Sequence, residues 1–291
     1  MKVTVLGANG MLGTDVVKVL EALGHEVKAL TRKDVDLTKP ATINDCKWLA
    51  RKNADWVVNC TAYTAVDKAE EEPEIAFDVN EEGVLNLCGK LNGGPRLLHI
   101  STDFVFDGTA TQPYVETDET NPLGVYGQSK LAGEHYAEAM LDDPIIFRTS
   151  WLFGPSGKSF PLTMINAHIA GRQLRVVADQ FGCPTYTVDL ATAIASALET
   201  NLETGIYHAC GSESMSWHSF AERVLGVFKG EAVSIEKIGT ADYPTPAKRP
   251  AYSVLNNAKL AAASISPWRP TDSAIEELIE RLQRGGNITS Q

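Results

Sequence analysis

The stretch VTVLGANGMLG, residues 3–13, decides the fold of the amino-terminal half. A short apolar run ends at Gly7, and Gly10 and Gly13 follow before apolar residues recur at helical spacing. A turn this tight favours residues without a Cβ, and so does close approach of the backbone to a diphosphate, which the first turn of a helix attracts. We therefore predict a dinucleotide-binding turn; a glycine-rich turn without ligand is the alternative. The residues expected to contact the cofactor here are Gly7, Gly10, Met11 and Leu12.

Strands and helices alternate over the first 150 residues. The pattern predicts strands at 26–30, 55–60, 96–102 and 145–150, and helices at 11–23, 73–91 and 126–140. Strands separated by helices indicate a parallel sheet covered on both faces, so we predict an α/β fold with a Rossmann-type doubly wound sheet. Further helices at 188–199 and 216–228 and a strand at 205–210 are predicted beyond it.

After residue 150 the alternation loosens, and proline is dense in YPTPAKRP (243–250) and SPWRP (266–270). We predict that residues 1–150 and 176–228 form the dinucleotide-binding domain. Residues 151–175 and 229–291 are predicted to form a smaller carboxyl-terminal domain that binds the substrate over the carboxyl edge of the sheet.

Composition narrows the partners. The net charge of −11 argues against nucleic acid and against an anionic membrane, and no stretch approaches the ~20 apolar residues of a membrane span. Five scattered cysteines without a CxxC pair favour free thiols in a reducing cytoplasm over a disulfide or zinc framework. We expect a cytoplasmic protein that binds no metal.

The segment YGQSK, residues 126–130, holds a tyrosine and a lysine one helical turn apart. Such a pair can be a plain contact on a helix surface. It can also be catalytic, because a lysine ammonium favours the charged form of a tyrosine, whose reference pKa is about 10. Thr102 is expected at the carboxyl end of a strand, where doubly wound sheets place their sites. We predict that Thr102, Tyr126 and Lys130 are catalytic, with Tyr126 as the proton donor to a carbonyl oxygen.

Longer motifs carry a family resemblance. They are VVNCTAYTAVDKAE (57–70), HISTDFVFDG (99–108), NPLGVYGQSKLAGE (121–134), FRTSWLFG (147–154), ADQFGCPTYTVDLA (178–191) and PAKRPAYSVLNNAKL (246–260). With the glycine turn and the Tyr-x-x-x-Lys pair, they resemble the extended short-chain dehydrogenase/reductase family and, within it, the dTDP-4-dehydrorhamnose reductases. The resemblance implies NAD(P)H as hydride donor and reduction of dTDP-4-dehydro-6-deoxy-L-mannose, a nucleotide-linked 4-keto sugar, to dTDP-L-rhamnose.

The cofactor's ribose is expected at the end of the strand at 26–30. An acid there would bind a 2′-hydroxyl, but Arg32 and Lys33 stand in this place, which favours NADPH with NADH still open. Both can equally be solvated loop charges. Asp36 and Leu37 are expected near the adenine. The resemblance implies that Thr61, Ala62 and Tyr63 line the diphosphate and ribose, with simple packing as the alternative for Tyr63.

The resemblance also implies a set of substrate-binding residues. Thr102 and Asp103 are expected to touch the sugar, and Trp151 to stack or hydrogen-bond against it, unless it is simply a buried tryptophan. Lys248 and Arg249 form a basic pair in an acidic chain and are expected to receive the substrate's diphosphate. A solvated charged loop is the alternative for this pair.

Phe104 departs from the family pattern, in which a tyrosine is usual. Nucleotide-sugar 4,6-dehydratases of the same superfamily have a glutamate here, and phenylalanine can neither remove nor deliver a proton, so elimination is disfavoured. Some reductases hold magnesium with glutamates at a dimer contact; Asp15 matches part of that set only, so we predict no metal and a possible homodimer. The alternatives are a reductase or epimerase acting on another keto sugar, and a non-catalytic subunit resembling the regulatory partner of methionine adenosyltransferase.

Overall fold

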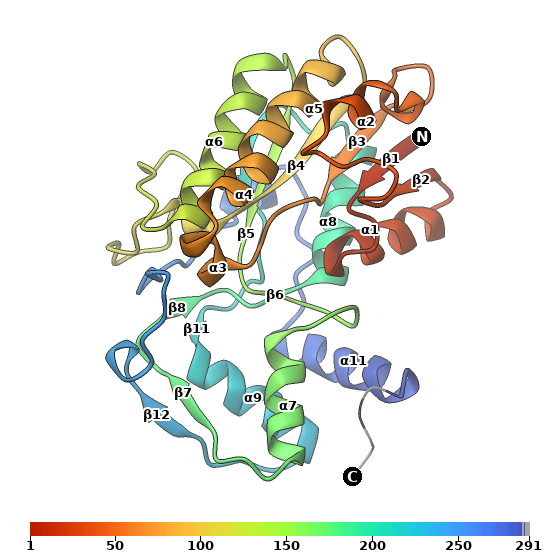
Figure 1. Ribbon diagram of the computed structural model, residues 1–291. Helices are drawn as coiled ribbons and strands as arrows, with labels where there is room; N and C mark the ends of the chain where they lie inside the picture. Colours follow the sequence, from red (N-terminus) through yellow and green to blue (C-terminus); the bar gives the residue numbers. More distant parts are fainter. Residues whose placement is uncertain (287, 289–291) are drawn as a thin grey trace.

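The computed structural model describes residues 1–286 and 288, which form a larger unit built on a sheet and a smaller unit below it (Figure 1). The sheet has six strands in the order β10-β5-β4-β3-β1-β2, and all neighbouring pairs are parallel. The strands are β1 (Lys2–Leu6), β2 (Glu26–Leu30), β3 (Trp56–Asn59), β4 (Arg96–Thr102), β5 (Ile145–Thr149) and β10 (Gly205–His208). The predicted doubly wound parallel sheet is confirmed.

Helices cover both faces of this sheet. They are α1 (Met11–Ala22), α2 (Pro40–Asn44), α3 (Val66–Glu71), α4 (Pro73–Phe77), α5 (Gly83–Leu91), α6 (Val125–Met140), α8 (Thr187–Glu199) and α10 (Ala258–Ala262). The single helix predicted at 73–91 is divided, because a π-helical turn, Asp78–Glu82, separates α4 from α5 and carries the buried Asn80. The predicted strands at 26–30 and 96–102 have the observed bounds.

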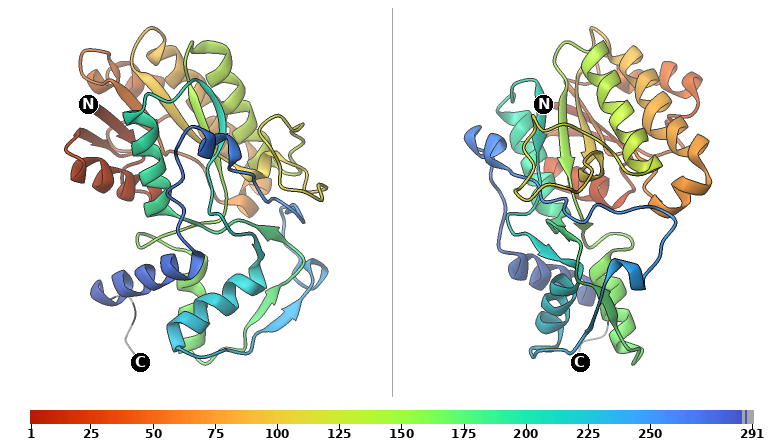
Figure 2. Two further views of the ribbon diagram at one scale, coloured as in Figure 1. Left: turned by 180° about the vertical axis from the view of Figure 1, so that it is seen from behind. Right: turned by 90° about the vertical axis from the view of Figure 1, so that its left-hand side faces the viewer.

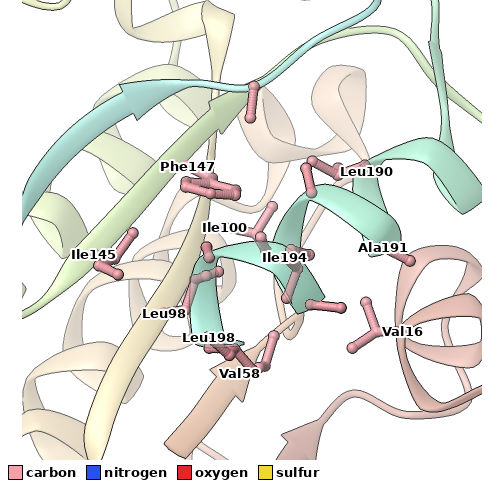
Figure 3. Close-up of a cluster of buried hydrophobic side chains, with 14 of the residues drawn as sticks. Val16, Val58, Leu98, Ile100, Ile145, Phe147, Leu190, Ala191, Ile194 and Leu198 are labelled. Carbon is pink, nitrogen blue, oxygen red and sulfur yellow. The ribbon is translucent and has the colours of Figure 1, made fainter. Parts of the chain in front are cut away.

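The two faces of the sheet have separate cores. On one face, side chains of the central strands pack against α1 and α8, as Figure 3 shows for Val58, Leu98 and Ile100 beside Ile194 and Leu198. On the other face, alternate residues of the same strands pack against α5 and α6. Successive side chains of a strand point to opposite sides of a sheet, so each strand supplies both cores.

The smaller unit is built of α-helices and short strand pairs (Figure 2). They are α7 (Phe160–Ile169), α9 (Trp217–Lys229), α11 (Thr271–Arg284), β7 (Arg175–Val177) with β12 (Glu236–Ile238), β8 (Phe181–Gly182) with β11 (Met215–Ser216), and β6 (Leu152–Phe153) with β9 (Thr185–Tyr186). Phe220 and Val224 of α9 share one core with Ile275 and Leu278 of α11. The two-domain division stays a proposal, and this packing argues for placing α9 in the smaller domain.

All five cysteines are free thiols. Over the residues described, none of the helices combines the length and the apolar character that a bilayer crossing requires.

Candidate active site

The glycine turn between β1 and α1 leaves no room for side chains. Gly7 has φ = 72°, in the left-handed region that favours glycine. A Cβ on Gly13 would lie 2.2 Å from the carbonyl oxygen of Gly7, so only a residue without one allows α1 to start this close to the strand. Ala8 N donates to Leu30 O at 3.0 Å and ties the turn to β2. The bare backbone at the first turn of α1 therefore fits the diphosphate of a dinucleotide.

Basic side chains gather beyond the end of β2. The Arg32 side chain is 74% exposed, and its Nε lies 3.2 Å from Asp36 Oδ2, while Lys39 Nζ lies 3.6 Å from the same oxygen. Burial works against ionisation of Asp36, but hydrogen bonds from Thr38 and Arg32 outweigh it and hold the pKa of this carboxyl below its usual value. The two cations leave this corner suited to a 2′-phosphate. Leu37 is buried against Gly83 in the core under α5.

Two buried asparagines hold the loop that follows β3. Thr61 N donates to Asn59 Oδ1 at 3.0 Å, and Tyr63 N donates to Asn80 Oδ1 at 2.8 Å. The Tyr63 hydroxyl donates to Glu72 at 3.1 Å. Thr61, Ala62 and Tyr63 thus lie at the carboxyl edge of the sheet, half-buried, as the predicted cofactor contact requires.

Tyr126 stands in the first turn of α6, at the same edge. The carboxylate of Glu70 accepts the Val125 N–H at 2.8 Å and so caps the start of this helix. The Tyr126 ring meets Phe104 edge to face, with 5.7 Å between centroids, and the Thr102 hydroxyl lies near the Tyr126 hydroxyl. Burial raises the pKa of Tyr126 to about 12, against the lowering effect of the Thr102 hydroxyl. The structure brings Tyr126 and Thr102 to the same edge of the sheet, and their catalytic role stays a prediction.

Lys130 lies on the same helix but faces inward. Its side chain is 1% exposed, and Nζ donates to Ile100 O at 2.6 Å and lies 3.3 Å from His99 Nε2. Burial lowers the pKa of Lys130 to about 8, while the nearby carboxylate of Glu134 opposes the change. The high pKa of Tyr126 therefore differs from the expectation that Lys130 lowers it: burial dominates at both residues.

Asp103 is buried directly behind Thr102. Thr102 Oγ1 donates to Asp103 Oδ1 at 3.1 Å. Burial raises the pKa of Asp103 to about 7, although the hydroxyls of Ser253 and Thr102 counteract the rise. A carboxyl group with a pKa near neutrality thus lies beside the hydroxyls of Thr102 and Tyr126.

Trp151 lies just after β5, which pairs with β4, the strand that ends at Thr102. Its backbone has φ = 46°, a strained value for a bulky residue. The indole stacks on Trp217 of α9, with 3.5 Å between centroids and 7° between planes. Its edge packs so closely on Gly182 that a Cβ there would lie 2.4 Å from Trp151 Cε2. The ring is half-buried and rigidly held where the two units meet.

The predicted basic pair divides. Arg249 binds Asp67 of α3 through two bonds, Nη1 to Oδ1 at 2.9 Å and Nη2 to Oδ2 at 2.7 Å. Lys248 is exposed and lines a small pocket together with Tyr126 and Glu70. The loop 245–250 is thereby fastened across the site, with Lys248 toward the pocket and Arg249 already paired.

No group of three or more histidine, cysteine, aspartate or glutamate side chains is arranged to hold a metal ion in the part of the chain that the structure covers. That the protein needs no metal stays a prediction.

The family model described as "RmlD substrate binding domain" matches residues 1–284. The chain belongs to this family. A curated RmlD-family relative, dTDP-4-dehydrorhamnose reductase of Burkholderia thailandensis, is 41% identical over 289 residues, covering 92% of this chain and 96% of that protein.

Solved structures of the RmlD family agree with the fold. A dTDP-4-dehydrorhamnose reductase from Clostridium acetobutylicum superposes with a TM-score of 0.91 at 38% identity, covering 97% of this chain and 100% of that one. The Bacillus anthracis enzyme, solved in complex with NADP, gives 0.90 at 31% identity and covers 96% and 99%.

Several residues at this RmlD-family site were not predicted from the sequence. They are Asn59, Glu70, Asn80, His99 and Trp217. A signal existed for both Asn59 and His99: Asn59 ends the apolar strand WVVN, and His99 follows two leucines within the strand RLLHIST. Glu70, Asn80 and Trp217 act through contacts that are remote in sequence, and their own surroundings show no such irregularity.

Proposed function

We propose that the chain is an NADPH-dependent reductase that converts the 4-keto group of dTDP-4-dehydro-6-deoxy-L-mannose to the hydroxyl of dTDP-L-rhamnose. Relatives at 38–41% identity bear the name dTDP-4-dehydrorhamnose reductase, and one related structure holds NADP. The observation that carries the proposal is the placement of Thr102, at the carboxyl end of β4, beside Tyr126 in the first turn of α6, with Lys130 one helical turn away.

The site can deliver a proton to a ketone. A pKa of about 12 keeps the Tyr126 hydroxyl protonated at neutral pH, which is the form that a general acid must have. Thr102, which lies near this hydroxyl, can direct it toward the carbonyl oxygen. NADPH, when bound, supplies the hydride for the carbonyl carbon.

The remaining roles follow from position. The glycine turn, Met11 and Leu12 would hold the diphosphate of NADPH, and Arg32 would hold its 2′-phosphate. Lys248 is better placed than Arg249 for the diphosphate of the sugar nucleotide, since Asp67 already neutralises Arg249. Trp151 and Asp103 would face the sugar.

Several expectations about partners stay predictions. They are a homodimer, a cytoplasmic location and no binding of nucleic acid. An epimerase or a non-catalytic regulatory subunit remains the competing interpretation, and both differ from a reductase in a measurable way, since neither consumes a nicotinamide cofactor.

The test is to follow the nicotinamide absorbance when the purified chain meets the dTDP-linked keto sugar with NADPH or NADH. Net oxidation of NADPH is expected. Tyr126→Phe should reduce kcat/KM by about 100-fold or more, the usual cost of a lost general acid. Tyr136→Phe, on the same helix, serves as the control and should retain activity. Absence of net oxidation would refute the reductase, and a near-normal rate in Tyr126→Phe would refute the mechanism.

A further inference from the structure

Three buried side chains form a hydrogen-bonded chain beneath α6. Asn59 and His99 are register partners on β3 and β4, so their side chains share one face of the sheet. Asn59 Nδ2 lies 3.1 Å from His99 Nδ1, and His99 Nε2 lies 3.3 Å from Lys130 Nζ. Asn59 and His99 are fully buried and Lys130 is 1% exposed, so their polar atoms must find hydrogen-bond partners inside the protein rather than in water.

The backbone determines which way Asn59 points. Thr61 N donates a hydrogen bond to one side-chain atom of Asn59 at 3.0 Å. A backbone N–H can only donate, so the atom that it meets must be the amide oxygen. The amide nitrogen of Asn59 is therefore the atom that faces His99. This nitrogen carries two hydrogens and cannot accept a hydrogen bond.

This orientation selects the tautomer of His99. Because Asn59 Nδ2 can only donate, His99 Nδ1 must accept and carries no hydrogen. A neutral imidazole then has its hydrogen on Nε2, which points at Lys130. Protonation of His99 Nδ1 would place its N–H against the Asn59 amide N–H, so that two donors would face each other. Burial and the nearby Lys130 also keep the pKa of His99 well below its usual value.

A ring N–H that faces Lys130 can bond only to a lone pair. An ammonium has none, whereas an amine has one and can still donate to Ile100 O, 2.6 Å away. We propose that Asn59 and His99 are positioning residues which lock the His99 tautomer that favours the neutral amine of Lys130.

The other groups around Lys130 leave this balance close. Burial lowers the pKa of Lys130 to about 8, whereas Glu134 on the same helix and the Cys60 thiol after β3 act in the opposite direction. The Nε2–H of His99 on β4 acts in the same direction as burial. Tyr126 lies one turn earlier on α6.

The tautomer of His99 can be measured directly. We expect ¹⁵N NMR of the full chain, without substrate or cofactor, to show a protonated Nε2 and a bare Nδ1 at His99, with His99→Gln used to assign the signals among the six histidines. A protonated Nδ1 in the wild-type protein would overturn the proposal.

Asn59→Asp should reverse the lock without changing the shape of the side chain. One carboxylate oxygen still accepts from Thr61 N, while the other accepts from His99 Nδ1–H, so Nε2 loses its hydrogen and accepts from a Lys130 ammonium. We expect the ¹³Cε titration of Lys130, assigned with Lys130→Met, to rise by about 1 pH unit or more, as an added opposite charge typically produces. An unchanged tautomer or an unchanged titration would contradict the lock.

Cys60→Asp is the matched control for charge. It adds a carboxylate beside Lys130 and leaves Asn59 in place, so the Lys130 titration should rise while His99 keeps Nε2–H. If His99 changes tautomer in Cys60→Asp as well, charge rather than Asn59 sets it and the proposal fails. These spectra need no turnover. The lock can therefore be confirmed even if the reductase assay fails, and it can be refuted even if the assay succeeds.

Discussion

The two faces of the central sheet are built from the same strands but from different chemistry. Facing α1 and α8, the strands present aliphatic and aromatic side chains (Figure 3). Facing α6 near their carboxyl ends, they present Asn59, His99, Ser101 and Arg148, which meet Lys130 and Glu134. Adjacent residues of one strand point to opposite faces of the sheet, so each polar residue is the sequence neighbour of an apolar residue on the other face. Both faces hold an apolar core, but only the face toward α6 also carries this cluster of buried polar and charged side chains.

Buried charge is tolerated beneath α6 because it is paired. Arg148 Nε lies 3.1 Å from both oxygens of Glu134, and Nη2 lies 2.7 Å from Oε2. The Ser101 hydroxyl donates to the same carboxylate. Both charged side chains are almost fully buried, so removing one leaves the other without solvent or partner.

The largest effect on stability is expected from breaking this pair. Glu134→Leu leaves the Arg148 charge buried and unpaired, which should lower the free energy of unfolding by about 3–5 kcal/mol. Urea denaturation measures the change. The double variant Glu134→Leu with Arg148→Met removes both charges and should recover most of the loss. Equal losses in the single and double variants would show that the apolar volume, rather than the charge, controls this face.

The opposite face should respond in stability alone. Leu198→Ala on α8 removes a buried side chain from the apolar core and leaves a cavity, which should cost about 2–5 kcal/mol. Below the unfolding transition, kcat/KM should match the wild type, because Leu198 packs away from α6. A large fall in kcat at unchanged secondary structure would remove the distinction between the two faces.

The smallest change, counted per pH unit, is expected from the titration of Asp103, which lies at the carboxyl edge of the sheet. Its pKa is raised from 3.8 to about 7 by burial, so the folded chain keeps a proton that the unfolded chain releases in this range. The contribution is fully present below the lower value and is lost as the pH rises through about 7. Stability should therefore fall with rising pH between these values, by up to about 1.4 kcal/mol per pH unit.

Asp103→Asn provides the comparison, because asparagine keeps the shape and cannot titrate. The free energy of unfolding of both proteins is measured at several pH values between 4 and 7. As the pH falls, the wild type should gain stability relative to the variant, so that the two curves converge. Parallel curves would show that Asp103 does not take up this proton.

The strands of the larger unit and its longer helices could be predicted because each has a local pattern, whereas the short helices α2, α3 and α10 were not predicted. Strands such as RLLHIST and helices such as 188–199 alternate with turns, and apolar spacing identifies them. The smaller unit was harder: β6, β8, β9 and β11 have two residues each, too few for a period to show. α9 has a clear helical pattern, but no local signal tells which core its apolar face joins.

The catalytic candidates could likewise be predicted, whereas their partners could not. Tyr126 and Lys130 are four residues apart on one helix, so spacing alone brings them into one region. The opposite directions of the two side chains, one toward Thr102 and the other toward His99, follow from burial. The pairing of Arg249 with Asp67 joins residues 182 positions apart and was likewise invisible.

The amino-acid sequence by itself determined the order of the strands and helices, the glycine turn and the position of each reactive side chain along the chain, because these depend on spacing and on residues that lack or carry a particular group. Only the tertiary structure decided which atoms meet. Asn59 and His99 are 40 residues apart, and His99 and Lys130 are 31 apart. Strand register and the packing of α6 bring them within hydrogen-bonding distance, and burial then sets their protonation, since no water remains to compete.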